Sequence, residues 1–419
     1  MSNLSKEMKK LAKCAHEASE KIAIADTRLK NKALEDVASA LRRNWKQMVA
    51  ANAKDLAYAD REGLTSAMKD RLMLNRARVE KMADAVLEVS KLKDPIHQTL
   101  SSWKRPNGLS ISKVSVPLGT ILIIYESRPN VTSECASLCL KSGNAVILRG
   151  GREALFSNQA IAKIYQKSLV KHHLPKETVT LIETTDRRAI DELLVLEEDI
   201  NLVIPRGGEA LIRRVAARSR IPVIKHYKGI CHVYVDKDAD LNMALRIALN
   251  AKCQRVSVCN AMETLLVHKK IAKAFLPHYA HLLRAARCEI RGDSATRRLI
   301  PDAKLATEKD WVTEYLDRII SIRVVRDINQ AIEHIKKYGS AHTDAIVTRN
   351  QRTAKTFSDL VDSSSVMVNA STRFSDGNEY GFGAEIGIST DKIHARGPMG
   401  LEGLTSYKYI VKGSGQVRA

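Results

Sequence analysis

The sequence predicts an α/β protein that has a doubly wound α/β unit, a second α/β unit and a small β arm. Three observations predict this. Short, continuously apolar segments alternate with helical segments between residues 117 and 380. Residues 3–92 carry apolar side chains at three-to-four spacing, which is typical of amphipathic helices. Two further strand-like segments, 109–116 and 405–411, lie outside this alternation.

Composition sets the class of protein. The 419 residues suffice for two or three domains, and the 44% of hydrophobic residues is too high for a disordered chain. We expect no transmembrane helix, because there is no apolar run of 18 residues, and no signal peptide, because the N-terminus lacks an apolar segment. Seven cysteines are too few for a disulfide scaffold. The expected compartment is therefore the reducing cytoplasm.

The chain is strongly basic, with 68 lysines and arginines against 47 acidic residues and a formal charge of +21. Such a charge is compatible with nucleic acid, a membrane surface or small anionic ligands. The basic residues are spread along the chain, and only 5% of residues are aromatic. This pattern favours a solvated surface or the attraction of anionic ligands over a nucleic-acid groove.

The elements follow in order. The helical lead ends at Asp94-Pro95, and the turn Asn107-Gly108 leads into the alternating strand 109–116, which predicts an exposed hairpin. The strands expected in the first α/β unit are 120–125, 145–148, 178–182 and 202–204, with helices at 131–140 and 154–169. The strands expected in the second unit are 232–235, 264–267, 319–325, 345–347 and 366–369. The segment 405–411 is interpreted as a returning arm.

Cys259 is a candidate nucleophile. It lies on a short connection between the apolar approach Val256–Val258 and the strand-like run 264–267. A thiol on such a connection is held rigidly, as a covalent catalyst requires. Arg255 would favour the thiolate if it points at the sulfur. The alternative is an inert buried cysteine, which is common in protein cores.

Two glycine pairs follow apolar strands, although no G-x-G-x-x-G motif is present. Gly150-Gly151 lies between Arg149 and Arg152, and Gly207-Gly208 follows Arg206. Backbone N–H groups at such strand-to-helix connections bind phosphate, and neighbouring arginines would suit NADP(H) better than NAD(H). The alternative is a pair of tight turns with solvated arginines.

Two other features have similar alternatives. Asn130 follows a buried strand and Pro129, so its amide could stabilise an oxyanion, or it could belong to an ordinary loop. Cys135 and Cys139 are four residues apart in an apolar helical segment, with no second pair at zinc spacing. We interpret them as core residues and expect no metal site.

Several long segments, in this order, resemble the aldehyde dehydrogenase superfamily, and within it the branch that reduces γ-glutamyl phosphate. The segments that carry the resemblance are 51–55, 70–72, 116–119, 127–131, 140–151, 224–236, 258–261 and 394–402. The resemblance covers nearly the whole chain. It favours the catalytic interpretation of Cys259 over the inert one.

The resemblance implies a domain organisation. Residues 1–100 and 117–231 would form the NADP(H)-binding domain with its helical lead, and residues 232–380 the catalytic domain. The hairpin 101–116 and the C-terminal arm 381–419 would associate subunits into a homo-oligomer, a dimer or a tetramer. A separate glutamate 5-kinase would supply the activated substrate, since the chain has no room for a fused kinase domain.

The resemblance also implies roles for particular residues. Cys259 corresponds to the nucleophile, and Asn130 to the side-chain oxyanion donor. The residues expected to bind the cofactor are Arg149, Gly150, Gly151, Pro205, Arg206, Gly207, Gly208 and Glu314. The residues expected to bind the substrate are Arg128, Arg255, Asn369, Ser371 and Arg373. Val256, Arg152 and Lys228 depart from the pattern of the family.

One departure concerns the reaction. Hydrolytic aldehyde dehydrogenases carry a water-activating glutamate, whereas the corresponding segment 225–229 has no carboxylate, and His226 is more simply a structural histidine. A thioester on Cys259 would then survive to react with hydride or phosphate. The expected activity is the NADPH-dependent reduction of L-glutamyl 5-phosphate to glutamate 5-semialdehyde. The two rival hypotheses are a hydrolytic aldehyde dehydrogenase and a basic nucleic-acid-binding protein.

Overall fold

The computed structural model describes residues 2–418. The chain forms two compact units. Unit 1 comprises Met1–Lys225, Gly381–Gly387 and Met399–Ala419, and unit 2 comprises His226–Tyr380 and Ile388–Pro398. Within residues 2–418, no helix combines the length and the apolar character that crossing a bilayer requires.

The N-terminal part of unit 1 is helical, as predicted. Its helices are α1 (Asn3–Ile22), α2 (Thr27–Arg43), α3 (Trp45–Arg61), α4 (Ser66–Leu72) and α5 (Arg76–Lys91). Side chains that accept hydrogen bonds from first-turn N–H groups begin four of these helices, at Ser2, Asp26, Thr65 and Asn75. α3 begins at Asn44 without such a side-chain cap.

Unit 1 contains a four-stranded parallel sheet in the order β5-β4-β3-β6. Its strands are β3 (Thr120–Tyr125), β4 (Ala145–Arg149), β5 (Val179–Leu181) and β6 (Leu202–Arg206). The connecting elements are α6 (Pro129–Lys141), η1 (Arg152–Ala154), α7 (Leu155–Lys171), η2 (Lys176–Thr178), α8 (Arg188–Leu193) and α9 (Glu209–Arg218). Leu122 and Ile124 face α1 and α8, whereas Ile121 and Ile123 face the opposite side, so both faces of the sheet are buried.

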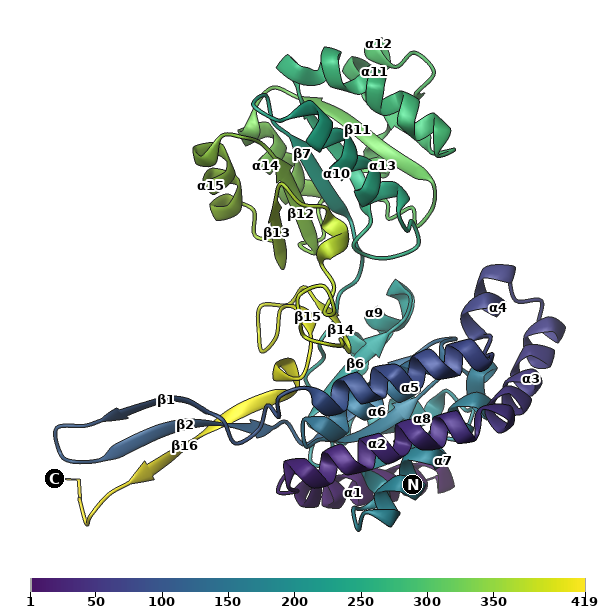
Figure 1. Ribbon diagram of the computed structural model, residues 1–419, viewed down its shortest axis with the longest axis vertical. Coiled ribbons are helices and arrows are strands. Elements are labelled where there is room, and N and C mark those ends of the chain that lie inside the picture. The colour runs from purple at the N-terminus through teal and green to yellow at the C-terminus, as the bar shows by residue number, and fades with distance from the viewer. Residues whose placement is uncertain (1, 419) are drawn as a thin grey trace. The chain divides into compact units, whose positions relative to one another are not determined.

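A three-stranded antiparallel sheet extends from the body of unit 1 (Figure 1). It consists of β1 (Thr99–Lys104), β2 (Ser110–Pro117) and β16 (Thr405–Lys412), with β2 in the middle. The predicted hairpin is β1–β2, and its turn requires a left-handed residue, Gly108 at φ +88°. β16 pairs with the whole length of β2.

Unit 2 is built on a seven-stranded parallel sheet in the order β10-β9-β11-β8-β7-β12-β13. Its strands are β7 (Cys231–Val235), β8 (Met262–His268), β9 (Glu289–Gly292), β10 (Lys304–Leu305), β11 (Ile319–Val325), β12 (Thr343–Val347) and β13 (Ser365–Val368). Its helices are α10 (Leu241–Cys253), α11 (Lys269–Ala285), α12 (Ser294–Leu299), α13 (Glu308–Trp311), α14 (Ile328–Tyr338), α15 (Gln351–Leu360) and η3 (Thr372–Phe374). The remaining C-terminal elements are β14 (Gly387–Ser389), β15 (Gly397–Met399) and η4 (Glu402–Leu404).

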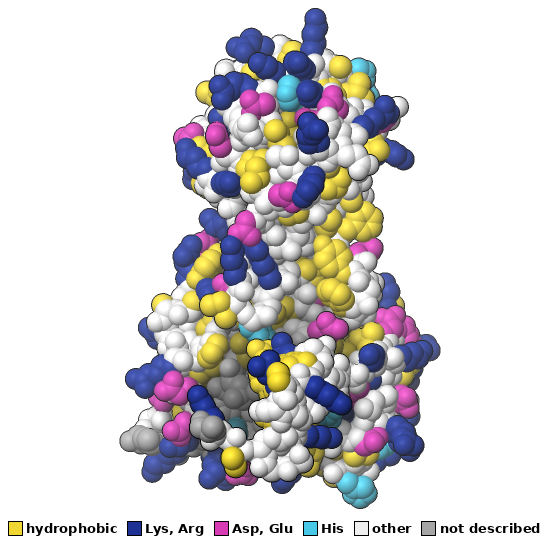
Figure 2. Space-filling view, turned by 90° about the vertical axis from the view of Figure 1, so that its left-hand side faces the viewer, with side chains coloured by type: hydrophobic (Ala, Val, Ile, Leu, Met, Phe, Trp, Pro, Cys, Tyr) yellow, Lys and Arg dark blue, Asp and Glu magenta, His cyan; other side chains and the backbone are white. Residues whose placement is uncertain are grey.

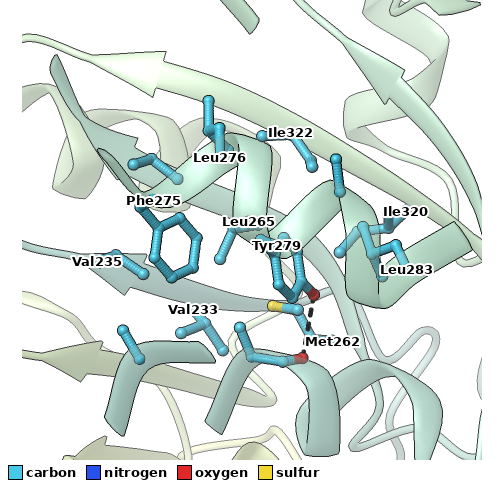
Figure 3. Close-up of a cluster of buried hydrophobic side chains, with 14 of the residues drawn as sticks. Val233, Val235, Met262, Leu265, Phe275, Leu276, Tyr279, Leu283, Ile320 and Ile322 are labelled. Carbon is cyan, nitrogen blue, oxygen red and sulfur yellow. Dashed lines mark hydrogen bonds between the residues drawn. The ribbon is translucent and has the colours of Figure 1, made fainter. Parts of the chain in front are cut away.

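Both faces of this sheet are also covered. On one face Phe275, Tyr279 and their neighbours from α11 pack on Leu265 and Val233, and Tyr279 donates a hydrogen bond of 3.1 Å to the carbonyl of Ala248 (Figure 3). On the other face Phe357 and other apolar residues of α14 and α15 form a second core. The predicted α/β fold class is confirmed, and the second unit is doubly wound as well.

On the face that Figure 2 shows, the surface charge is dispersed. Figure 2 shows lysine and arginine side chains scattered over one face, between acidic, apolar and uncharged groups, and not gathered into one patch. This distribution agrees with the interpretation of the charge from the sequence. It does not resemble a single continuous nucleic-acid groove.

Candidate active site

Cys259 lies on the loop 254–261, which connects α10 to β8 in unit 2. The preceding loop 226–230 leads into β7, which is the parallel neighbour of β8, with Cys231 paired with Met262. Because parallel strands in this register begin side by side, the two loops meet at the amino ends of β7 and β8. The half-buried Cys259 is therefore held next to the loop that carries Gly229.

Gly229 packs directly on the backbone of Cys259. A Cβ atom at position 229 would lie 2.5 Å from the Cα and 2.6 Å from the carbonyl carbon of Cys259, and closer still to its oxygen. Only glycine fits this approach. The Gly229 N–H donates a hydrogen bond of 3.0 Å to Oε1 of Glu314, and the buried Cys231 thiol lies 3.2 Å from the Cys259 carbonyl oxygen.

Arg373 spans the nucleophile loop, which we define as residues 254–261. Its guanidinium donates to Oε1 of Gln254 at 2.8 Å and to the side-chain oxygen of Asn260, so it holds the loop on both sides of Cys259. The Asn260 amide in turn donates to the carbonyl of Ser375 at 2.9 Å. Burial lowers the pKa of Arg373, and the nearby Arg255 lowers it further. Cys259 is close enough to interact electrostatically with Arg373.

Two other predicted substrate residues take part in local structure. Asn369, at φ +55°, accepts a hydrogen bond from the N–H of Thr348 and donates one to its carbonyl, both at 2.9 Å. Ser371 accepts a hydrogen bond of 3.3 Å from the Arg373 N–H. Both side chains fix the segment that carries Arg373. Arg255 is exposed on the nucleophile loop.

A buried ion pair joins the two ends of the nucleophile loop. Nζ of Lys252, at the end of α10, lies 2.6 Å from Oε2 of Glu263 in β8, and both side chains are buried. The second oxygen of Glu263 accepts the N–H of Leu316 at 3.1 Å, which stabilises Leu316 in the left-handed region at φ +54°. Burial raises the pKa of Glu263 to about 7, although Lys252 opposes this shift. The pair therefore links both ends of the nucleophile loop to the segment that carries Glu314.

Two histidines lie close to this site. The rings of His226 and His342 are 5.8 Å apart, edge to face, and Nδ1 of His342 is 3.8 Å from the Cys231 sulfur. Burial lowers the pKa of His342 to about 3, so it is neutral at physiological pH. His342 and Cys231 are buried next to the nucleophile loop, and His226 is half-buried.

Unit 1 holds a cavity of about 590 Å³ at the carboxyl ends of its parallel strands. Its lining includes Tyr125, Arg149 and Thr185, which lie at or just beyond the ends of β3, β4 and β5, and Leu211 of α9. Ligands of doubly wound sheets bind at this edge, where successive connections leave in opposite directions. The volume is in the range of small-molecule sites.

Arg149 is the most deeply buried cation of this cavity, with 7% of its surface exposed. Its guanidinium donates to the carbonyls of Gly150 and Thr185, and its buried Nε has no hydrogen-bond partner among the described residues. Burial lowers its pKa. At Gly150 a Cβ would overlap the amide of Asn158. A buried guanidinium with spare donors beside closely packed glycines fits a phosphate-bearing cofactor.

The second glycine pair lies at the end of β6. A Cβ at Gly207 would lie 2.7 Å from Cδ of Glu126, whereas Gly208 has open space around it. The Arg206 side chain lies beside Gly387 and Cys135 and does not line the cavity. The neighbouring Pro205 is buried in β6. Cys135 and Cys139 are buried in α6, as predicted.

Asn130 is the second residue of α6, directly after Pro129. Its amide donates a hydrogen bond of 2.7 Å to Glu134, one turn further along the helix. Arg128 precedes the helix and is half-buried. A half-buried amide at a helix start is available for an oxyanion if the Glu134 side chain gives up this contact.

Sequence reasoning missed several residues of these sites. Arg187 and Arg214 also line the cavity of unit 1, and Gly229 and Asn260 fix the nucleophile loop. Arg187 follows β5 in the run 184–188, so its position after a strand was a usable signal. The role of Gly229 depends on the pairing of β7 with β8, which the sequence does not display.

Comparison with known proteins gives the family. Residues 3–307 match the aldehyde dehydrogenase family. The chain belongs to the aldehyde dehydrogenase family. Within the family, it is 52% identical over 415 residues to a gamma-glutamyl phosphate reductase of Geobacter metallireducens, with 99% of each chain covered.

Two further relatives carry the same name. A gamma-glutamyl phosphate reductase of Carboxydothermus hydrogenoformans is 54% identical over 412 residues, with 98% of this chain and 99% of the relative covered. The crystal structure of gamma-glutamyl phosphate reductase from Thermotoga maritima superimposes with a TM-score of 0.97 at 48% identity. It covers 99% of this chain and 100% of that one. The aldehyde dehydrogenase fold that the sequence resemblance implied is thus confirmed.

Proposed function

We propose that the protein reduces L-glutamyl 5-phosphate to L-glutamate 5-semialdehyde with NADPH and releases phosphate, the second step of proline biosynthesis from glutamate. The observation that carries this proposal is sequence identity above 50%, over the full length, to enzymes named gamma-glutamyl phosphate reductase. In addition, hydrogen bonds from Arg373 hold the loop that carries Cys259. The activity is that of a phosphorylating glutamate-5-semialdehyde dehydrogenase. We expect it in the cytoplasm.

Cys259 is the proposed nucleophile. Its thiolate attacks the γ-acyl carbon, and the C–O bond to phosphate breaks as the tetrahedral intermediate collapses to a thioester. The Cys259 backbone N–H would stabilise the oxyanion, and Asn130 is the side-chain donor that the family resemblance implies. The cofactor, when bound, supplies the hydride. The hydride adds to the carbonyl carbon of the thioester, and cleavage of the C–S bond then releases the semialdehyde and restores the Cys259 thiolate.

The surroundings of Cys259 disfavour hydrolysis of the thioester. The segment 225–229 has no carboxylate, and Gly229 packs on the Cys259 backbone where a bulkier residue would not fit. The two nearby carboxylates already accept hydrogen bonds, Glu314 from Gly229 and Glu263 from Lys252 and Leu316. Without a carboxylate in segment 225–229 to activate water, phosphate is the expected acceptor in the reverse direction.

The substrate carries a carboxylate and a phosphate, which require cationic partners. Arg128, Arg255 and Arg373 are the proposed cations, with Asn369 and Ser371 fixing the segment of Arg373. Arg373 also interacts electrostatically with Cys259, so its charge serves the thiolate as well as the substrate. The proposed cofactor residues are Arg149, Gly150, Gly151, Pro205, Arg206, Gly207, Gly208 and Glu314. Of these, Arg149 and Gly151 line the cavity of unit 1, whereas Arg206 does not, so its proposed contact with the cofactor would lie outside this cavity.

The domains would have distinct roles. Residues 1–100 and 117–231 would bind NADPH in the cavity of unit 1, and residues 232–380 would carry out acyl transfer. The arm of β1, β2 and β16 would associate subunits, because its outer strands β1 and β16 are exposed and present Trp103, Tyr407 and Tyr409. Analytical sedimentation of a Tyr407→Asp/Tyr409→Asp variant tests this role, and we expect a smaller assembly than in the wild type. An unchanged assembly would contradict the proposed role of the arm.

The reverse reaction tests the proposed activity. Glutamate 5-semialdehyde and NADP are mixed with and without inorganic phosphate, and NADPH absorbance is followed. We expect a rate that requires phosphate and disappears in Cys259→Ala. Cys14→Ala, in α1, is the matched control and should keep the full rate. A rate that is equal without phosphate would mean a hydrolytic dehydrogenase, and no rate in either condition would reject the proposal.

A further inference from the structure

A second cavity of unit 1 has no place in this reaction. It measures about 470 Å³ and lies where α7 packs against α2 and α3. We call it the basic groove and define it by Arg43, Lys54, Lys163, Lys167 and Lys171 on its walls. It shares no lining residue with the cavity that holds Arg149.

The positive charge of the basic groove is largely unmatched. Asp36 is the acidic residue among its lining residues, and it forms an ion pair of 2.5 Å with Lys171. Within residues 2–418, no ion pair engages Arg43, Lys54, Lys163 or Lys167. Four cations therefore face one small volume without an anionic partner.

This arrangement works against the stability of α7. Lys163, Lys167 and Lys171 recur at every fourth residue and so form one row on the helix. Like charges at this spacing repel one another and destabilise a helix. Solubility alone would be served equally well by lysines dispersed around the helix. The row instead lines a cavity, which is the arrangement expected of an anion site.

The start of α3 also lies at the basic groove, since Asn44 and Gln47 are among the lining residues. Asn44 precedes this 17-residue helix, but its amide donates to the carbonyl of Ala40 at 2.8 Å and does not cap the first turn. The N–H groups at the start of α3 therefore keep their capacity to donate. Because α2 ends at Arg43, at the same junction, the two helix dipoles oppose each other there, and the positive charge of the groove comes from its side chains.

The floor of the basic groove is apolar. Met48 and Ile164, exposed by 1% and 8%, lie beneath the cations. Phe156 lies among the lining residues with 42% of its surface exposed, and Nζ of Lys54 is 5.4 Å from the centre of its ring. An exposed ring beside cations is a surface on which a nucleobase can stack.

We infer that the basic groove binds a small molecule that carries two or more phosphate groups. Four unmatched cations and free backbone donors supply the charge and the hydrogen bonds that such a molecule requires, and the volume is sufficient for it. The same phosphate chemistry is found in an inorganic polyphosphate and in a nucleoside polyphosphate. Stacking on Phe156 would favour the nucleoside form.

Calorimetric titration of the full chain with sodium tripolyphosphate, and separately with ATP, tests this inference. The titrations are made in the presence of saturating NADPH at physiological ionic strength. The groove variant is Lys163→Glu/Lys167→Glu. The control is Lys269→Glu/Lys273→Glu on α11, where two exposed lysines have the same spacing but line neither cavity described here. Retained NADPH-dependent activity shows that both variants fold.

We expect one equivalent of tripolyphosphate to bind, about tenfold or more weaker in the groove variant and nearly unchanged in the control. If ATP binds more tightly than tripolyphosphate, and this difference is lost in Phe156→Ala, the ligand is a nucleoside polyphosphate. If the two probes bind equally well, the ligand is an inorganic polyphosphate. Equal weakening in both variants would overturn the inference, because it would reveal general attraction to a basic protein. Binding that is seen only when NADPH is omitted, or no binding at all, would overturn it as well.

Discussion

The contact between Gly229 and Cys259 makes a strong prediction for a single methyl group. In Gly229→Ala the new Cβ would lie 2.5 Å from the Cα and 2.6 Å from the carbonyl carbon of Cys259, and closer to its oxygen. All three atoms are backbone, so no side chain can rotate to make room. The nucleophile loop must move by about 1 Å, which costs about 1–3 kcal/mol of stability.

The catalytic cost should be about 2.7 kcal/mol, which is similar to the upper end of the cost in stability. Displacement of a reacting group by about 1 Å lowers turnover by roughly 100-fold. The movement would also disturb the Gly229–Glu314 hydrogen bond of 3.0 Å and the contact of Cys231 with the Cys259 carbonyl. We therefore expect kcat/KM to fall about 100-fold in a protein that is still folded.

Three measurements separate the effects. They are kcat/KM for phosphate-dependent NADP reduction, the rate of Cys259 alkylation by iodoacetamide, and the free energy of unfolding in urea. Gly403→Ala is the control, because the atoms nearest to its Cβ lie 3.4 Å away in Met399. Wild-type activity and alkylation in Gly229→Ala would refute the idea that this contact positions the nucleophile.

Three further predictions concern the support of the site. Lys252→Met leaves Glu263 buried without its cation and should lower the free energy of unfolding in urea by about 3–5 kcal/mol. The double variant Lys252→Met/Glu263→Met should recover much of this loss. A double variant that is no more stable than the single one would contradict this prediction. Burial lowers the pKa of His334 to about 2 and that of His342 to about 3, so the folded state takes up fewer protons than the unfolded one. The free energy of unfolding should therefore reach its full value above pH ~6.5 and fall by about 1.4 kcal/mol per histidine for each pH unit below that. Urea unfolding at neutral and acidic pH measures this change, and a free energy that does not vary with pH would disprove it. Arg373→Lys keeps the charge but loses the hold on both sides of Cys259, so kcat should fall about tenfold; a rise in KM alone would indicate substrate binding instead.

The central strands were predictable because both of their faces are buried. Strands such as Thr120–Tyr125 and Ile319–Val325 are nearly continuous apolar runs, and both were predicted at the observed bounds. Strand β9 (Glu289–Gly292) and the edge strand β10 (Lys304–Leu305) were missed, because they are short and largely polar. The pairing of β16 with β2 depends on tertiary structure, and no local pattern reports it.

For the candidate site, the sequence led to a proposed nucleophile but not to the contacts that hold it. Cys259 was proposed from its position before a strand and from the family resemblance. The buried Lys252–Glu263 pair reads in the sequence as two ordinary surface charges. The hold of Arg373 on Asn260 joins residues that are 113 positions apart. Such contacts follow from how the strands are ordered in the sheet, which a sequence pattern does not contain.

The segmented course of the chain has a consequence during synthesis. β2 ends at Pro117 and its partner β16 begins at Thr405, so 405 − 117 = 288 positions separate them. At translation rates of about 5–20 residues per second, β16 is synthesised on the order of 15–60 s after β2. In that time its edge toward β16 is open to other chains. A nascent protein arrested before residue 405 should therefore recruit chaperones that recognise open strand edges, and release of the finished C-terminus should end that recruitment.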